Sequence, residues 1–141
     1  MYFVDKTLLN KRLNYIESMT KEVDTDNPLA LERACLMLIE ATVDVGNMII
    51  DAFILRDPGS YQDVIDIMAQ EKVINDEDAE KFKNTLKWRL ELTRNYTDID
   101  HAQMKKDFLD NLDAYENFKA SFEHFKKNDP QAVNAFMSDD V

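Results

Sequence analysis

The sequence predicts an all-α protein, and three observations lead to this fold class. Only two glycines and three prolines occur in 141 residues, so long uninterrupted helices are expected, whereas all-β folds need more turn residues. Apolar residues recur every three or four positions through most of the chain, which is the period of an amphipathic helix. The breaks are short, and each helix needs partners to bury its apolar face. We therefore expect a single domain over 1–141, an up-and-down bundle of about four main helices plus short extra helices.

The first two helices are expected over residues 5–22 and 28–55. Asp5 can cap the first, and Asp26 or Asn27 can cap the second. The apolar surface of the second helix is wide, which indicates that most of this helix is buried. It consists of Leu31, Cys35, Leu38, Ile39, Thr42, Val45, Ile49 and Phe53.

One polar line remains on the second helix. Its members are Arg33, Glu40, Asp44, Asn47 and Asp51, which project within about 40° of one direction. On one interpretation this line is the solvent side of a mostly buried helix. On the other, Glu40, Asp44 and Asn47 face a polar pocket. Spacing alone leaves both interpretations open.

Two shorter patterns follow the second helix. Ser60, with Asp63 three residues later, resembles a capping box and begins a short third helix that reaches about Met68. Asn75 can cap a fourth helix, which we expect to run from about 76 into the stretch 86–100.

A fifth helix is expected over 101–127, with Asp100 as its N-cap. Its apolar line is rich in aromatic residues, and such a line forms either the core of a bundle or a dimer surface. The line consists of Phe108, Leu112, Tyr115, Phe118, Phe122 and Phe125. The tail, about 128–141, has an acidic end and room for a short helix up to Phe136.

Composition and charge exclude several classes of function. The net charge of −11 argues against general DNA binding, because phosphate contacts need a basic surface. No apolar run reaches the ~18 residues of a membrane span, and no signal-peptide pattern opens the chain, so we expect a cytoplasmic protein with no membrane association. The two glycines, Gly46 and Gly59, cannot form a phosphate loop or a dinucleotide motif.

Neither a metal nor a cofactor is expected. The single cysteine, Cys35, excludes an intramolecular disulfide and a cysteine metal cluster, and we expect it to be a small core residue. His101 and His124 are too far apart in sequence to form a helical metal pair.

The most informative stretch is residues 86–100, which read LKWRLELTRNYTDID. Arg89 falls on the helical face that otherwise carries apolar side chains. If the helix continued far enough, that face would contain Phe82, Leu86, Arg89, Thr93 and Tyr96. An arginine on a buried face is costly unless it is paired or points into a polar cavity or interface. The stretch then becomes a polar corner from Asn95 to Asp100.

A purely structural interpretation of this corner is available. Arg89 and Arg94 would pair with Glu40 and Asp44 and with the negative end of the helix dipole. On this interpretation the cations stabilise the end of a helix and have no further role.

The run LERACLMLIEATVDVGNMII of the second helix and the later WRLELTRNYTDID resemble the HepT-like proteins of the HEPN superfamily. The family motif is Arg, four to six residues, His, one residue, Tyr, and then an Ile-Asp pair. Arg89 matches the Arg, Tyr96 matches the Tyr, and Arg94 occupies the position of the His. Glu40, Asp44 and Asn47 match the polar residues of the family's second helix.

The resemblance implies a HEPN-like fold and a homodimer in which two motif copies face each other. Family members with the full motif are metal-independent endoribonucleases, many of them toxins. Their antitoxin is a minimal nucleotidyltransferase of the MntA type, which is thought to add AMP to the motif tyrosine. The resemblance therefore implies RNA as substrate, Arg89, Arg94 and Tyr96 as catalytic residues, Tyr96 as AMP acceptor, and Glu40, Asp44 and Asn47 as supporting residues.

Arg94 decides whether the implied cleavage can proceed. A histidine can transfer protons near neutral pH, whereas an arginine can only bind and stabilise negative charge. A second register, from Arg94 to His101, would need a tyrosine at position 103 and finds Gln103. His101 could still substitute for the missing histidine if it lies near the corner.

Three functions therefore stay open from the sequence. The first is a HepT-like ribonuclease, and the second is a non-catalytic homodimeric module that binds a nucleotide or a partner. The third is a structural or regulatory helical dimer without a ligand.

Overall fold

The structure is a computed structural model that describes residues 4–53 and 57–129. These residues form helices and connecting turns without any strand, which confirms the predicted all-α class. The expected tail at about 128–141, with its helix to Phe136, lies almost entirely outside the described residues. In chain order the helices are α1 (Lys6–Thr20), α2 (Pro28–Phe53), α3 (Tyr61–Gln70), α4 (Asp76–Leu86), α5 (Trp88–Thr93), α6 (His101–Asp110) and α7 (Leu112–Asn128).

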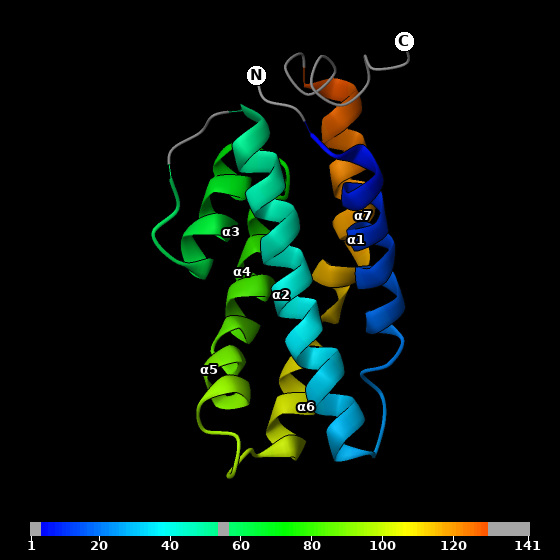
Figure 1. Ribbon diagram of the computed structural model, residues 1–141, viewed down its shortest axis with the longest axis vertical. Coiled ribbons are helices and arrows are strands. Elements are labelled where there is room, and N and C mark those ends of the chain that lie inside the picture. The colour runs from blue at the N-terminus through cyan, green and yellow to red at the C-terminus, as the bar shows by residue number, and fades with distance from the viewer. Residues whose placement is uncertain (1–3, 54–56, 130–141) are drawn as a thin grey trace.

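The long helix α2 is the centre of the bundle (Figure 1). Helices α1 and α7 lie side by side on one flank, while α3, α4 and α5 lie on the other. Helix α6 packs beside the first half of α2. Residues of α2 therefore contact α1, α3, α5 and α6, and side chains from distant parts of the sequence meet along it.

Local capping explains where most helices begin. Each N-cap side chain accepts a hydrogen bond from a backbone N–H of the first turn, which would otherwise lack a partner. Asn27, and not Asp26, caps α2, because its Oδ1 accepts from the N–H groups of Leu29 and Ala30. The other predicted caps are confirmed at Asp5, Ser60, Asn75 and Asp100.

The fourth predicted helix is wrong as one continuous element, because it breaks at Lys87 into α4 and α5. The Thr85 hydroxyl donates to the Phe82 carbonyl at 2.9 Å and so competes for an acceptor of the helical ladder. The same hydroxyl lies 2.7 Å from the hydroxyl of Tyr115 on α7. Lys87 keeps right-handed helical angles of φ −58° and ψ −27°, so the chain direction changes little into α5.

Helix α5 ends at Thr93, so the Arg89 face does not continue to Tyr96, and the polar corner begins close to the predicted position, Asn95. The N–H groups of Arg94 and Asn95 both bond to the Leu90 carbonyl, at 2.8 and 3.2 Å, which closes the last turn. The Asn95 amide then donates to Glu91 at 2.7 Å. Tyr96 consequently lies in the turn after the helix.

The fifth predicted helix is divided at Asn111 into α6 and α7. The Asn111 amide donates to the Asp107 carbonyl at 2.8 Å, and its Oδ1 accepts from Asn84 of α4 at 3.0 Å. An asparagine that bonds its own backbone offers an alternative to the helical ladder, which explains the break.

The aromatic line of the fifth predicted helix is core and not a dimer surface. Phe108, Tyr115, Phe118, Phe122 and Phe125 are all buried within the chain. Phe82 packs edge-on against Tyr115 and Phe118, with ring centroids 4.8 and 5.6 Å apart. Cys35 is fully buried as predicted, and burial raises the pKa of its thiol to about 12. Among the described residues no helix is long and apolar enough to cross a membrane.

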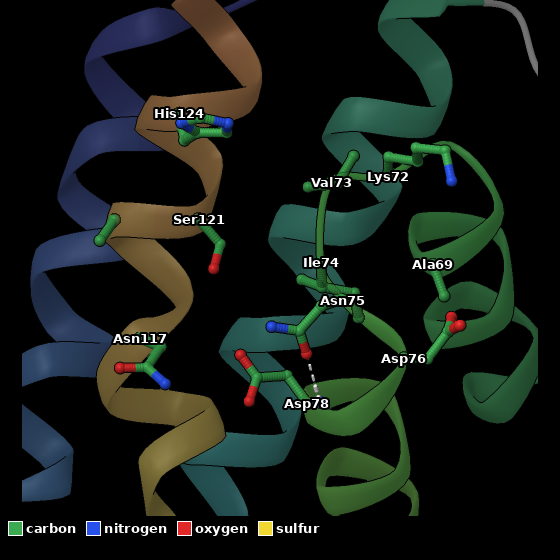
Figure 2. Close-up of a pocket in the computed structure, with 11 residues that line it drawn as sticks. Ala69, Lys72, Val73, Ile74, Asn75, Asp76, Asp78, Asn117, Ser121 and His124 are labelled. Atoms are coloured by element: carbon green, nitrogen blue, oxygen red, sulfur yellow. Dashed lines mark hydrogen bonds between the residues drawn. The ribbon is translucent and has the colours of Figure 1, made fainter. Parts of the chain in front are cut away.

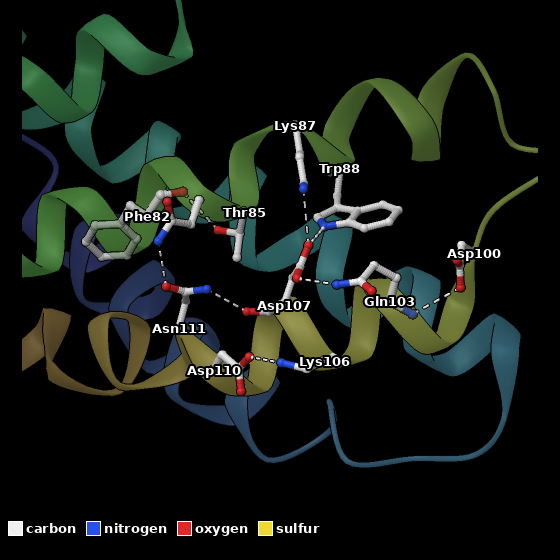
Figure 3. A network of polar contacts seen from close by, with 11 residues as sticks. Phe82, Thr85, Lys87, Trp88, Asp100, Gln103, Lys106, Asp107, Asp110 and Asn111 are labelled. Atoms are coloured by element: carbon white, nitrogen blue, oxygen red, sulfur yellow. Dashed lines mark hydrogen bonds and ion pairs between the residues drawn. The ribbon is translucent and has the colours of Figure 1, made fainter.

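Asp107 of α6 ties α5 to the bundle (Figure 3). Its carboxylate accepts from the indole N–H of Trp88 at 2.9 Å and from the Gln103 amide at 2.8 Å, and Lys87 lies 3.3 Å away. Burial alone would raise the pKa of Asp107, but these donors outweigh burial and lower it below the ordinary value. The anchored residue Trp88 directly precedes Arg89, so this network fixes the start of the helix that carries Arg89.

Candidate functional site

Arg89 of α5 points at α2, where it meets Glu40. Its Nε lies 2.7 Å from Oε1 of Glu40, a charge-assisted hydrogen bond. The Arg89 side chain is 42% exposed and that of Glu40 is 28% exposed. The arginine is therefore a paired side chain at the rim of the bundle, which resolves the apparent cost of a cation on an apolar face.

Tyr61, the first residue of α3, completes the group around Arg89. Its hydroxyl donates to Oε2 of Glu40 at 3.0 Å. Its ring lies under the guanidinium, with Cζ of Arg89 4.4 Å from the ring centroid, which is within the range of a cation–π contact. Helices α2, α3 and α5 thus each supply one side chain to an Arg89–Glu40–Tyr61 cluster.

Arg89 and Tyr61 both keep their protons in this cluster. The hydrogen bond to Glu40 raises the pKa of Arg89 above its ordinary value, so the guanidinium is a permanent cation. Burial, followed by the hydrogen bond to Glu40, raises the pKa of Tyr61. Tyr61 is therefore a protonated donor throughout the neutral range.

The other supporting residues predicted on α2 lie farther from Arg89. Asp44 is exposed and Asn47 is half-buried, and within the described residues neither forms a hydrogen bond or ion pair with Arg89 or Arg94. Partial desolvation raises the pKa of Asp44, although the charge of Arg12 on α1 opposes this shift. Arg12 itself donates to the sulfur of Met48 at 3.1 Å. The polar line of α2 is thus partly a solvent side and partly, at Glu40, the partner of Arg89 and Tyr61.

Arg94 and Tyr96 lie at the outer end of the corner. Both are exposed, and Tyr96 retains 63% of its accessible surface. Arg94 is the C-cap of α5, and within the described residues it forms no salt bridge with Glu40 or Asp44. The purely structural interpretation, in which both arginines pair with these carboxylates, therefore holds for Arg89 with Glu40 and fails for Arg94 in the single chain.

His101 is held away from the cluster. Its Nε2 lies 2.7 Å from Oε2 of Glu32, near the start of α2. Glu32 and Glu40 are eight residues apart, which corresponds to about 12 Å along a helix. His101 of the same chain therefore does not take the place of a histidine beside Arg89.

The arrangement at the corner is suited to binding a phosphate. Arg89 donates its Nε–H to Glu40, and 42% of its side chain stays exposed. Two parallel N–H donors match the oxygens of a phosphodiester. Arg94 adds a second exposed cation five residues later in the chain.

A separate hollow of about 600 Å³ lies between the turn before α4 and the helix α7 (Figure 2). Asp78, Asn117, Ser121 and His124 are among its polar lining residues. Burial, together with the charge of Asp113, raises the pKa of Asp78. None of the predicted site residues lines this hollow, so it is distinct from the motif corner. Within the described residues no group of three or more His, Cys, Asp or Glu side chains forms a candidate metal site.

Tyr61 is the residue of the cluster that sequence reasoning missed. It precedes Arg89 by 28 positions and belongs to the short third helix, where its apolar ring predicts nothing beyond packing. Its role depends on α3 packing beside α2, and no local spacing reveals such a contact. Glu40 and Arg89, in contrast, were both singled out from the sequence, and the structure brings them together.

Comparisons with known proteins agree on one family. The family model described as "Ribonuclease HepT-like" matches residues 9–122. The chain is 32% identical over 143 residues to a protein of Bacillus subtilis (strain 168) named "Putative RNase YutE", with 96% of this chain and 99% of that protein covered. A solved structure of YutE from Bacillus subtilis, described as a cytosolic protein of unknown function, matches with a TM-score of 0.86 and 31% identity. That match covers 96% of this chain and 100% of the other.

Proposed function

Because the chain belongs to the HepT-like ribonuclease family, we propose that it is a metal-independent endoribonuclease with Arg89 at its phosphate site. The observation that carries this proposal is the geometry of Arg89. Nε of Arg89 lies 2.7 Å from Oε1 of Glu40, while 42% of the arginine side chain stays exposed. An arginine held in this way is preorganised for an anionic ligand, and preorganised charge is the main contribution of a protein to such a reaction.

The proposed reaction is attack of a ribose 2′-hydroxyl on the adjacent phosphorus. A new bond forms between the 2′ oxygen and phosphorus, and the bond to the 5′ oxygen of the next nucleotide breaks. The products are a 2′,3′-cyclic phosphate and a 5′-hydroxyl. Arg89 and Arg94 stabilise the charge that develops on the non-bridging oxygens. Arg94 cannot accept the 2′-hydroxyl proton, so we assign to solvent both the removal of that proton and the protonation of the departing 5′ oxygen, and we expect slow cleavage that accelerates with pH.

A second candidate function is a non-catalytic module that binds RNA or a nucleotide. The observation in its favour is Arg94, which stands where family members with the full motif carry their proton-transferring histidine. On this proposal Arg89 and Arg94 bind phosphate but no bond is broken.

We also propose a homodimer. Two large side chains around the corner, Leu90 and Tyr96, are 58% and 63% exposed in the single chain. A second copy would cover these side chains and bring a second pair of arginines to the site. Sedimentation at micromolar concentration tests this point, and a clean 16.5 kDa monomer would contradict it.

A toxin–antitoxin role is proposed from the family resemblance. The partner would be a minimal nucleotidyltransferase in the cytoplasm, because the related YutE is described as a cytosolic protein. The exposure of Tyr96 supports this proposal, because a hydroxyl that accepts AMP has to reach the active site of another protein.

Incubation of the purified full chain with single-stranded RNA and EDTA tests the main proposal. Cleavage by the parent protein that is lost in Arg89→Ala supports a metal-independent ribonuclease. Binding of RNA without cleavage, also lost in Arg89→Ala, would support the non-catalytic module. If the parent neither cleaves nor binds RNA at high protein concentration, both proposals are wrong.

A further inference from the structure

The Glu40 carboxylate is shared between two donors from different helices. Oε1 accepts from Arg89 at 2.7 Å, and Oε2 accepts from Tyr61 at 3.0 Å. With one oxygen held by the tyrosine, the carboxylate cannot rotate freely. The position of the Arg89 Nε is therefore set by two residues and not by Glu40 alone.

The Tyr61 ring restrains Arg89 in a second way. The guanidinium carbon lies 4.4 Å from the ring centroid, so one side of the guanidinium faces the ring. The hydrogen bond to Glu40 restrains the Nε edge, and the ring limits motion toward α3. The part of the arginine side chain that stays exposed, 42% of it, is available to a ligand.

The start of α3 is itself firmly placed. Ser60 accepts from the N–H of Asp63 at 3.1 Å, which caps the helix directly before Tyr61. Val64 and Ile65, one turn later, are buried in the core. Tyr61 thus extends from an anchored helix end and provides a rigid support for a long, flexible arginine.

We propose that Tyr61 is a positioning residue for Arg89, holding the guanidinium by ring contact and by its hydrogen bond to Glu40 so that the terminal amino groups meet the RNA phosphate. This inference rests on the proposed function, because it assigns the phosphate of RNA as the ligand of Arg89. Tyr61 does not touch the substrate in this proposal and acts only through Arg89 and Glu40.

The first test is spectroscopic and needs no RNA. In ¹H–¹⁵N spectra of the full chain, the Arg89 Nε–H signal should show a ring-current shift from Tyr61. We expect Tyr61→Phe to retain this shift, because it keeps the ring, and Tyr61→Leu to abolish it. An unshifted Arg89 signal in the parent protein would overturn the proposed placement.

The second test is a double-mutant cycle on single-stranded RNA, read as the cleavage rate or, if the protein only binds, as affinity. We expect Tyr61→Leu to lower the cleavage rate or the affinity about 100-fold, and Tyr61→Phe to lower it about tenfold. Tyr61→Leu combined with Arg89→Ala should be no worse than Arg89→Ala alone, because Tyr61 acts through Arg89. Fully additive losses would overturn the positioning role.

Tyr115→Phe is the matched control. It also removes one tyrosine hydroxyl, which lies 2.7 Å from Thr85 in the core and is hydrogen-bonded neither to Glu40 nor to Arg89. If Tyr115→Phe lowers activity as much as Tyr61→Phe does, a general loss of stability explains both and the proposal is wrong. If the parent protein neither cleaves nor binds RNA, the proposed function is wrong, and so is the role of Tyr61 in it. The NMR signal of the Arg89 Nε–H would still show in that case whether the contact between Arg89 and the Tyr61 ring exists.

Discussion

Arg89 and Glu40 are 49 positions apart in the chain, and Nε of the first lies 2.7 Å from Oε1 of the second. This ion pair lies at the rim of the bundle, where pairs contribute only about 0–1 kcal/mol to stability. The ion pair therefore orients Arg89 and adds little to the stability of the fold.

Glu40→Gln should consequently separate activity from stability. The amide keeps an acceptor oxygen but loses the charge that holds Arg89, so we expect RNA cleavage or binding to fall between about tenfold and 100-fold. The free energy of unfolding in urea should change by less than about 1 kcal/mol. Asp110→Asn is a matched control, since it disrupts the exposed Lys106–Asp110 pair of α6. Equal activity of the two variants would contradict the role of Glu40.

Arg94→His should restore a proton-transferring group at the motif position. General acid–base catalysis contributes about 10²- to 10⁴-fold, so we expect RNA cleavage at neutral pH to increase at least about 100-fold. The pH–rate profile should gain a limb near the pKa of histidine, about 6.5. Arg94→Gln removes the cation without adding a proton acceptor and is the control. If both variants cleave at the same rate, loss of the arginine and not gain of the histidine is responsible.

The helices and their starts followed from local chemistry. Asp5, Ser60, Asn75 and Asp100 each cap a first turn within three residues, so the sequence contains the whole interaction. The burial of Cys35 and of the aromatic line followed from helical periodicity for the same reason.

The breaks at Lys87 and Asn111 could not be predicted in this way. Each accompanies a contact between helices, of Thr85 with Tyr115 and of Asn84 with Asn111, which exists only after the bundle has formed. The candidate site also depends on contacts between helices, which local sequence patterns do not contain. Glu40 belongs to the one polar line of α2, and Arg89 interrupts an apolar face, so the sequence predicts both as site residues. The position of Tyr61 in a short helix carries no such signal.

Tyr96 should be modifiable without cost to the fold. It is 63% exposed in the turn after α5, so Tyr96→Phe should change the free energy of unfolding by no more than about 0.5 kcal/mol. Intact-mass measurement after incubation with ATP and a minimal nucleotidyltransferase should show one added AMP in the parent protein and none in Tyr96→Phe. Tyr15→Phe, at a half-buried position on α1, should be modified normally. Addition of AMP to Tyr96→Phe would place the acceptor elsewhere.

Gly46 permits the close approach of α3 to α2 on which the Tyr61–Glu40 contact depends. A Cβ at position 46 would lie 2.5 Å from Cγ1 of Val64 and 3.2 Å from Cε of Met68. Overpacking of this kind costs about 1–3 kcal/mol, which exceeds the gain of about 0.5–1 kcal/mol from replacing glycine in a helix. We expect Gly46→Ala to lower the melting temperature and to weaken RNA cleavage or binding. Gly59→Ala, where the nearest atom is 3.9 Å away, should be nearly neutral, and equal effects of the two changes would contradict this explanation.

Asp107 should make the attachment of α5 dependent on pH. Its pKa is lowered in the folded protein, so its contribution to stability is present above the unfolded pKa, about 3.9, and is lost as the pH falls through the folded value. Asp107→Asn removes the charge opposite Trp88 and Lys87, and we expect it to lower the free energy of unfolding by about 1.5–3 kcal/mol at about pH 7.

The difference between the parent protein and Asp107→Asn should then shrink as the pH falls below about 4, because the parent carboxylate also becomes neutral. Urea unfolding at several pH values measures this difference. Asp110→Asn, on the exposed side of the same helix, should show a smaller effect at neutral pH. A constant difference between Asp107→Asn and the parent across the acidic range would mean that the shape of the side chain, and not its charge, holds Trp88 beside Arg89.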